Sequence, residues 1–336
     1  MWRSILAGLL VAAVAIPTGL VGGRTVSREG FLWFGWPGVY FQTRLKGTGL
    51  SIRLDAPDDN FRVLVDDKLH RLVRKPAGKI SITGLRSGMH MVRVERLTEN
   101  QQQSARFGGF LAGPGATLLP VTPLSNQIEF IGDSYTVGYG NISPTTVCSA
   151  EQVHDRTNTS RAFSVLTAKS LTADYRIIAL SGYGVVRNTG GIHPGDNMPA
   201  RYPRVLPSAA GATASDPGWN PDWIVIYLGI NDFSTPLQPG EKWASLAALM
   251  KDYQESYLRF ARTVHARYPA AQFLLIASPA FAAPLQRVAT TLRAENIAVA
   301  VLDSPPVMGT ACQNHPGLQD HASLAKAVVA AIRQKR

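Results

Sequence analysis

Short apolar runs alternate with turn residues through the first third of the chain, over residues 30–122. The runs cover residues 38–41, 50–54, 61–65, 79–82, 90–94 and 109–111. Runs of this length, with no helical period between them, are typical of antiparallel strands. The spacing predicts a β-sandwich or jelly-roll module for residues 30–122.

The pattern changes over residues 124–336, where apolar runs alternate with helical periods. The runs cover residues 128–131, 176–180, 223–228, 272–276 and 297–302, and the clearest helical periods cover 243–268 and 322–332. Alternating strands and helices predict an α/β domain, with a parallel sheet and helices on both faces. Ligands of such sheets bind at the carboxyl ends of the strands, so motifs that directly follow a strand are the functional candidates.

The first 23 residues have the pattern of a targeting segment. Arg3 is followed by an apolar stretch over residues 5–15, and residues 5–21 carry no charge. The segment predicts either a signal peptide or an uncleaved N-terminal membrane anchor, because 17 uncharged residues are the lower limit for a spanning helix. In both cases we expect the rest of the chain to be exported, to the periplasm or the extracellular space.

Composition and charge narrow the function classes. The chain is 45% hydrophobic and 17% charged, as expected for a globular protein, and its net charge is +11. Residues 24–122 hold 15 basic and 8 acidic residues, scattered among apolar positions as on the wet face of strands. No nucleic-acid motif accompanies them, so no nucleic-acid partner is predicted. A basic surface of this kind would also suit an acidic polysaccharide.

The cysteine content is compatible with an exported protein. Cys148 and Cys312 are the two cysteines of the sequence, and they form either one disulfide or two free thiols. No Cys-x-x-Cys or Cys/His spacing suggests a zinc site, and the acyl-transfer chemistry considered below needs no metal or cofactor.

Four segments that follow strands or precede the last helix together contain the groups that acyl transfer requires. Ser134 lies at a strand-to-helix turn, where the helix N-terminus favours negative charge. Gly182 and Asn231 each follow a later strand and can donate N–H groups to an oxyanion. His315 lies in the loop before the last helix, where it can act as a base. The order Ser, Gly, Asn, His is far more specific than any one of these residues alone.

These motifs resemble those of the SGNH, or GDSL, hydrolases, and within them the family 2 carbohydrate esterases. The matching segments are residues 128–134, 138–141, 181–184, 187–188, 198–199, 228–233 and 315–316. The resemblance implies a flavodoxin-like catalytic domain behind an N-terminal jelly roll. It implies Ser134 as the nucleophile and His315 as the general base. The backbone N–H groups of Ser134 and Gly182 and the Asn231 amide are the implied oxyanion hole.

The sequence departs from the family pattern beside the histidine. Many SGNH hydrolases have an aspartate three residues before it, whereas this chain has Cys312. We therefore expect a backbone carbonyl to orient His315, as the resemblance implies for members that use a Ser–His dyad. Asp303 and Asp320 are the alternative carboxylates for this role.

A second departure concerns substrate recognition, because Asn314 stands where relatives of the family often have an aromatic residue. Candidate substrate-binding residues are Tyr135, Tyr183, Phe233 and Asn314, with Tyr139 and Trp219 as further aromatic candidates. Asp133 and Asp232 belong to the family motifs and are expected to accept hydrogen bonds rather than to act as a glycosidase pair.

The implied activity is that of a serine esterase that removes O-acetyl groups from hemicellulose such as xylan, glucomannan or xyloglucan. The implied partner is therefore an acetylated polysaccharide or oligosaccharide. One alternative is a deacetylase of bacterial envelope glycans or exopolysaccharides. Another is a carbohydrate-binding protein without catalytic activity.

Overall fold

The N-terminal domain is a sandwich of two antiparallel sheets. The computed structural model describes residues 19–209, 214 and 218–335. One sheet has the order β1 (Leu20–Gly22), β4 (Tyr40–Gly47), β9 (Gly88–Arg96), β6 (Asn60–Val65) and β7 (Lys68–Arg74), with β11 (Thr117–Leu119) also paired to β4. The other has the order β2 (Val26–Arg28), β3 (Phe31–Phe34), β10 (Ala105–Ala112), β5 (Leu50–Asp55) and β8 (Ala77–Ile82).

Aromatic side chains from the two sheets meet inside the sandwich. The Phe41 ring of β4 stacks on the Phe107 ring of β10 with centroids 3.9 Å apart, and Phe34 of β3 packs edge-on against Phe41. Inward-facing positions alternate with exposed ones along β5, as the sequence pattern predicts.

The C-terminal domain is built on a five-stranded parallel sheet. The strand order is β13 (Ala173–Ala179), β12 (Asn126–Gly132), β14 (Trp223–Tyr227), β15 (Gln272–Ala277) and β16 (Val299–Asp303). With β12 first along the chain, this is the flavodoxin-like order 2-1-3-4-5. Every residue of β14 is buried, which matches its continuous apolar sequence.

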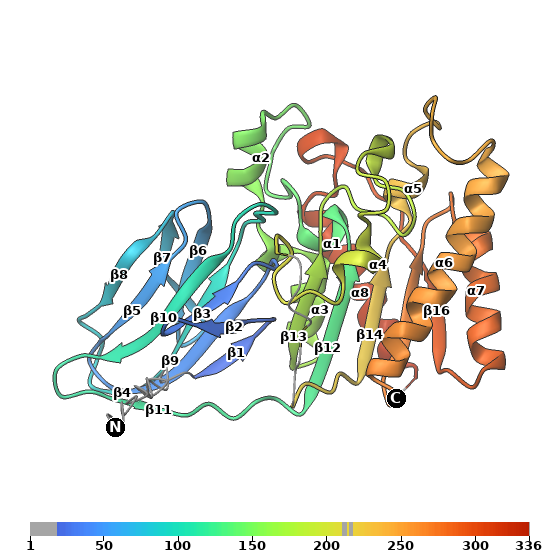
Figure 1. Cartoon of the computed structure of the whole chain (residues 1–336). Helices are drawn as coiled ribbons and strands as arrows, with labels where there is room; N and C mark the ends of the chain where they lie inside the picture. Colours follow the sequence, from blue (N-terminus) through green and yellow to red (C-terminus); the bar gives the residue numbers. More distant parts are fainter. Residues whose placement is uncertain (1–18, 210–213, 215–217, 336) are drawn as a thin grey trace, which may run out of the picture.

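Helices cover both faces of this sheet (Figure 1). α3 (Phe163–Ser170) packs with α8 (Leu318–Arg333), and α6 (Leu246–Arg267) packs with α7 (Ala282–Ala294). Short helices lie at the carboxyl ends of the strands: α1 (Ser134–Val137), α2 (Ala150–Arg156), α4 (Met198–Arg201), α5 (Ile230–Phe233) and the 3₁₀ turns η1 (Thr159–Arg161), η2 (Thr189–Gly191) and η3 (Cys312–Asn314). Of these, α1, α5 and η3 carry or adjoin the candidate site residues Ser134, Asn231 and His315.

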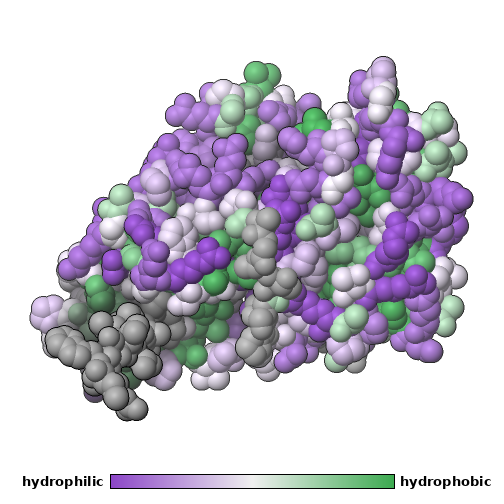
Figure 2. Space-filling view, viewed as in Figure 1, coloured by the Kyte–Doolittle hydropathy of each residue, from purple (hydrophilic) through white to green (hydrophobic). Residues whose placement is uncertain are grey.

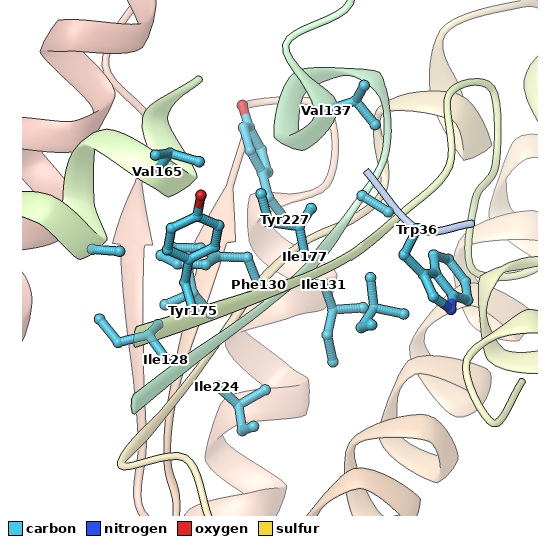
Figure 3. Close-up of a cluster of buried hydrophobic side chains, with 14 of the residues drawn as sticks. Trp36, Ile128, Phe130, Ile131, Val137, Val165, Tyr175, Ile177, Ile224 and Tyr227 are labelled. Carbon is cyan, nitrogen blue, oxygen red and sulfur yellow. The ribbon is translucent and has the colours of Figure 1, made fainter. Parts of the chain in front are cut away.

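The two domains share one continuous hydrophobic core. Trp36 leaves the sandwich and is fully buried, in the same cluster as Ile131 and Ile177 of the parallel sheet (Figure 3). Gly38 follows with φ +65°, and a Cβ on it would lie 2.7 Å from the Ile177 side chain. Glycine is therefore required at this close approach between the domains.

The described residues begin inside the segment predicted to be for targeting. Residues 1–18 lie outside the described part, and Leu20–Gly22 form β1, paired with β4. The last residues of the predicted segment therefore lie in the N-terminal sheet. In the described part of the chain, no helix combines the length and apolar character needed to cross a membrane. Polar residues dominate the face of both domains seen in Figure 2.

Candidate active site

The four residues singled out in the sequence come together at the carboxyl edge of the parallel sheet. Ser134 begins α1 just after β12, Gly182 lies in the loop after β13, and Asn231 lies in α5, the short helix after β14. His315 precedes α8. Neighbouring parallel strands end at the same edge, which explains why residues about 180 positions apart meet there.

Ser134 and His315 form a hydrogen-bonded pair. The Ser134 hydroxyl lies 2.9 Å from Nε2 of His315. Asp133 caps the short helix α1 by accepting a hydrogen bond from the Tyr135 N–H at 3.0 Å, which fixes the turn that presents Ser134. Ser134 is only 4% exposed, so its hydroxyl is held in a desolvated position beside the imidazole.

Backbone carbonyls orient the histidine. Nδ1 of His315 lies 3.1 Å from the Cys312 carbonyl oxygen and 3.2 Å from that of Gln313. Carbonyl oxygens only accept hydrogen bonds, so the ring proton sits on Nδ1 and Nε2 is left to accept the Ser134 hydroxyl proton. Gln313 and Asn314 have φ values of +53° and +58°, and this left-handed turn aims the carbonyls at the ring.

The environment of the imidazole favours its neutral form. Burial lowers the pKa of His315 below its ordinary value, although the two carbonyl contacts act in the opposite direction. Tyr139 lies against the ring, with centroids 4.5 Å apart, and its hydroxyl donates to the side-chain oxygen of Gln313 at 3.1 Å. A neutral, oriented imidazole can remove a proton from a serine hydroxyl.

The alternative carboxylates do not orient the histidine. Asp303 is exposed at the end of β16, and no hydrogen bond joins it to His315 within the described residues. Asp320 instead accepts the N–H groups of Met308 and Gly317 at 2.9 and 3.0 Å, at the start of α8. The structure therefore gives Asp303, the predicted possible catalytic residue, no contact with His315, whose Nδ1 faces the carbonyls of η3.

A disulfide joins Cys148 to Cys312 and so ties η3 to the loop before α2. Of the two alternatives left open by the sequence, the structure has the bonded one. The bridge packs against Gly140, where φ is +58° and a Cβ would lie 2.5 Å from the Cys312 Cβ. The loop after Ser134 and the loop before His315 are thus fixed to each other.

Two backbone N–H groups and one amide form a candidate oxyanion hole. Within the described residues, no hydrogen bond takes up the Gly182 N–H, whose residue has φ +85°. Ser134 supplies a second N–H at the start of α1. The Asn231 amide nitrogen donates to the Tyr183 carbonyl at 2.9 Å and to Asp133 at 3.2 Å. The longer Asp133 contact is the one that a substrate oxyanion could replace.

Two buried aspartates support this edge of the sheet. Asp232 accepts the N–H groups of three consecutive residues, 185–187, at 2.8–3.1 Å. Burial raises the pKa of Asp133 to about 7 and that of Asp232 to about 6. Both carboxyls are bound to backbone or amide donors, which is the supporting role expected from the sequence.

The predicted substrate-binding residues fall at different distances from the dyad. Tyr135 packs edge-on against His315, with centroids 5.7 Å apart, and Asn314 is exposed beside it. Tyr183 and Phe233 are partly buried at the same edge; Phe233 stacks on core aromatic rings. Trp219 is different, because it is buried before β14 at the opposite end of the sheet, stacked against Arg176.

A loop of the sandwich reaches this edge, and the sequence did not identify it. Glu99 and Gln101, between β9 and β10, bind the backbone of Ser181. With Tyr139 and α2 they line a cavity of about 740 Å³ between the domains. The polar run of residues 99–103 has the pattern of an ordinary strand connection, so only the fold reveals its position.

Comparisons with known proteins agree with this geometry. Residues 21–122 match the family described as Carbohydrate esterase 2 N-terminal, and residues 130–335 match the GDSL-like Lipase/Acylhydrolase family. The chain is 39% identical over 315 residues to an acetylxylan esterase / glucomannan deacetylase of Cellvibrio japonicus (strain Ueda107), covering 90% of this chain and 86% of that protein. The chain belongs to carbohydrate esterase family 2.

Solved structures of family 2 carbohydrate esterases show the same architecture. One, whose active site is described as displaying divergent catalytic and non-catalytic binding functions, superposes with a TM-score of 0.88 at 37% identity, covering 94% of this chain and 97% of the other. The Clostridium thermocellum family two esterase in complex with cellohexaose gives a TM-score of 0.82 at 26% identity, covering 94% and 98%. The predicted fold class and esterase family are confirmed.

Proposed function

We propose that this esterase removes O-acetyl groups from a neutral plant polysaccharide of the xylan or glucomannan type. The observation that carries the proposal is the contact of 2.9 Å between Ser134 and an imidazole whose Nδ1 is held by two carbonyls. The relative from Cellvibrio japonicus bears the name acetylxylan esterase / glucomannan deacetylase. The pair supplies a nucleophile and a base for ester cleavage, and the likeness to that relative supports an acetyl ester as the bond that is cleaved.

The proposed reaction proceeds through an acyl-enzyme. Nε2 of His315 takes the Ser134 proton while Oγ attacks the acetyl carbonyl carbon. The N–H groups of Ser134 and Gly182 and the Asn231 amide stabilise the negative oxygen of the tetrahedral intermediate. His315 then gives the proton to the departing sugar oxygen. Water, activated by the same imidazole, attacks the acetyl group and releases acetate and free Ser134.

The cavity beside Tyr139 supports a neutral glycan as substrate. Its wall carries the amide side chains of residues 100–103, which suit hydroxyl groups because an amide both donates and accepts. The same wall carries the acidic residues Asp58, Glu99 and Glu151 against the basic Lys75, so it has no excess of positive charge that would select an acidic glycan. An uncharged chain that extends from Ser134 past Tyr139 would meet this surface.

The test is acetate release from acetylated xylan and acetylated glucomannan by the wild type and by Ser134→Ala. We expect release that falls by several orders of magnitude in the variant, since only oxyanion and binding contributions would remain. An aryl acetate serves as the small-substrate control. A folded wild type that released acetate from neither polymer nor aryl acetate would contradict the proposal and favour carbohydrate binding without catalysis.

The basic character of residues 24–122 favours a second candidate, the deacetylation of acidic envelope glycans or exopolysaccharides. Attraction between an acidic polymer and this surface would weaken as salt screens it. Activity on an acidic acetylated polymer that falls steeply with salt, and exceeds that on xylan, would establish this candidate. Equal activity at low and high salt would favour the neutral substrate.

The proposed place of action is outside the cytoplasm. Support comes from the N-terminal pattern of residues 1–23 and from the Cys148–Cys312 disulfide, since such bonds persist in oxidising compartments. Detection of the protein in the periplasmic or culture fraction, against a cytoplasmic marker enzyme, tests it. Retention with the cytoplasmic marker would contradict it.

A further inference from the structure

The sandwich loop between β9 and β10 holds one peptide group of the catalytic domain. The Gln101 side-chain nitrogen donates to the Ser181 carbonyl oxygen at 2.9 Å. A carboxylate oxygen of Glu99 accepts the Ser181 N–H at 2.8 Å. Both the N–H and the carbonyl oxygen of Ser181 are therefore bound by side chains of the other domain, about 80 residues earlier in the chain.

The carbonyl that Gln101 holds belongs to the same peptide as the candidate oxyanion donor of Gly182. A trans peptide is planar, and its C=O and N–H point in opposite directions. Fixing the Ser181 oxygen on one side therefore fixes the direction of the Gly182 N–H on the other. Within the described residues the Gly182 N–H has no hydrogen-bond acceptor, so it stays available for a substrate oxygen.

The contact that fixes this peptide matters because the backbone at Gly182 can adopt many conformations. Gly182 has φ +85°, and a Cβ would find only the Thr189 side chain, at 3.4 Å. Glycine loses more conformational freedom on ordering than other residues, so the peptide needs external contacts to hold one orientation. The Gly182 carbonyl adds one by accepting the Thr189 N–H at 2.9 Å, and Gln101 and Glu99 supply the others.

Glu99 also orders Gln101. The same carboxylate oxygen that accepts the Ser181 N–H accepts the Gln101 side-chain N–H at 3.0 Å. This second contact fixes the rotamer of the amide that reaches Ser181. Glu99, Gln101 and Ser181 thus form a closed set of three hydrogen bonds at the domain junction, and we name it the Ser181 clamp.

We propose that the Ser181 clamp positions the Gly182 N–H for the oxyanion, which gives the N-terminal sandwich a part in acyl transfer. Gln101 and Glu99 are positioning residues, because they touch Ser181 and not the reacting atoms. The inference rests on the proposed function, since it concerns the same tetrahedral intermediate. Its consequence is kinetic: loss of the clamp affects turnover more than substrate binding.

The first variant is Gln101→Met, which keeps the length of the side chain and removes the donor. Its matched control is Gln286→Met on the outer face of α7, an exposed glutamine far from the cavity beside Tyr139 whose side chain makes no hydrogen bond within the described residues. With an aryl acetate, we expect kcat of Gln101→Met to fall by about 10-fold, less than the 10²–10³ for deletion of a donor. KM should stay within about twofold, since the small substrate contacts neither side chain.

The second pair of variants tests the acceptor and provides rescue. Glu99→Gln retains an oxygen that can accept from Ser181 and Gln101, so it should keep most of the wild-type kcat. Glu99→Ala removes that acceptor and should match Gln101→Met. The rate of inactivation by an aryl phosphonate, which forms a tetrahedral anionic adduct on Ser134, should fall in parallel with kcat.

The outcomes separate this inference from the proposed function. A wild type without esterase activity would overturn the proposed function and, with it, the clamp. An active wild type whose Gln101→Met and Glu99→Ala variants keep normal kcat and phosphonate reactivity, even with lower thermal midpoints, would overturn the clamp alone. The Ser181 contacts would then serve only to join the domains.

Discussion

At the scale of single residues, His315 works without a carboxylate partner. Two carbonyls of a left-handed turn place the proton on Nδ1, and burial disfavours the charged ring. A carbonyl orients the imidazole but stabilises its positive form less than a carboxylate would. The charge that develops on His315 during proton transfer is therefore stabilised by the Cys312 and Gln313 carbonyls, which accept the Nδ1 proton and favour the charged ring.

The low pKa of His315 predicts the acid limb of the pH profile. The base must be neutral to accept the Ser134 proton, so activity is lost as pH falls through the histidine pKa. Because burial lowers that pKa below 6.5, kcat/KM for an aryl acetate should lose activity only below pH 6.5. A limb centred near pH 7 would contradict this and would point to Asp133, whose pKa burial raises to about 7.

At the scale of elements, the turn η3 depends on its covalent attachment. Cys312 is the first residue of η3 and its carbonyl contacts Nδ1 of His315. The disulfide to Cys148, together with the Gln313 N–H bond to the Thr146 carbonyl at 2.6 Å, fixes η3 to the loop before α2. The geometry of the base is therefore set by the partner loop as much as by η3 itself.

Removal of this disulfide should weaken both stability and turnover. The Cys148→Ala/Cys312→Ala variant should lose about 2–5 kcal/mol of unfolding free energy, because the bond closes a loop of 164 residues. Chemical denaturation measures the loss, and the wild type treated with a thiol reductant is the control. Unchanged stability and kcat in both samples would contradict the expectation.

The elements that the sequence predicted are those with a strong period or a family motif. The apolar runs at 128–131 and 223–228 became β12 and β14, and the helical period at 243–268 became α6. β7 was missed because it is exposed along almost its whole length and shows no alternation. The hydrophobic pattern of a sequence cannot reveal such an exposed strand, because only its pairing with β6 makes it a strand.

The site was predictable where a residue follows a strand, and not where it depends on a contact across the fold. Ser134, Gly182, Asn231 and His315 could be singled out as candidates, since each belongs to a segment that the fold brings to the edge of the sheet. Gln101 was not, because its contact with Ser181 spans 80 residues and two domains. For the same reason, Asp303 looked available for His315 until the carbonyls of η3 were seen at Nδ1.

At the scale of the whole molecule, a buried ion pair joins the two domains. Arg24, which precedes the second strand of the sandwich, lies 3.6 Å from Glu129 of β12, and neither side chain is exposed. The guanidinium also donates to the carbonyl oxygens of Tyr202 and Arg204. Such a pair contributes to stability only while both partners are present.

Arg24→Met should therefore destabilise the protein by about 3–5 kcal/mol, since Glu129 would be left buried without its cation. Urea denaturation measures the change, with Arg28→Met on the exposed side of β2 as the control. A loss of less than about 1 kcal/mol, equal to that of the control, would show that solvent reaches Glu129 when the cation is absent.

The Cys148–Cys312 disulfide should also let the enzyme stay in one piece after a protease cuts its chain. Ser134 precedes Cys148 and His315 follows Cys312, so the bond joins the piece that carries the serine to the piece that carries the histidine. A protease that cuts an exposed stretch between them, such as residues 193–195, would leave two chains linked as one molecule. Nicked enzyme would migrate intact on a non-reducing gel and as two fragments after reduction. Ser134 and His315 would therefore remain in one molecule until the disulfide is reduced.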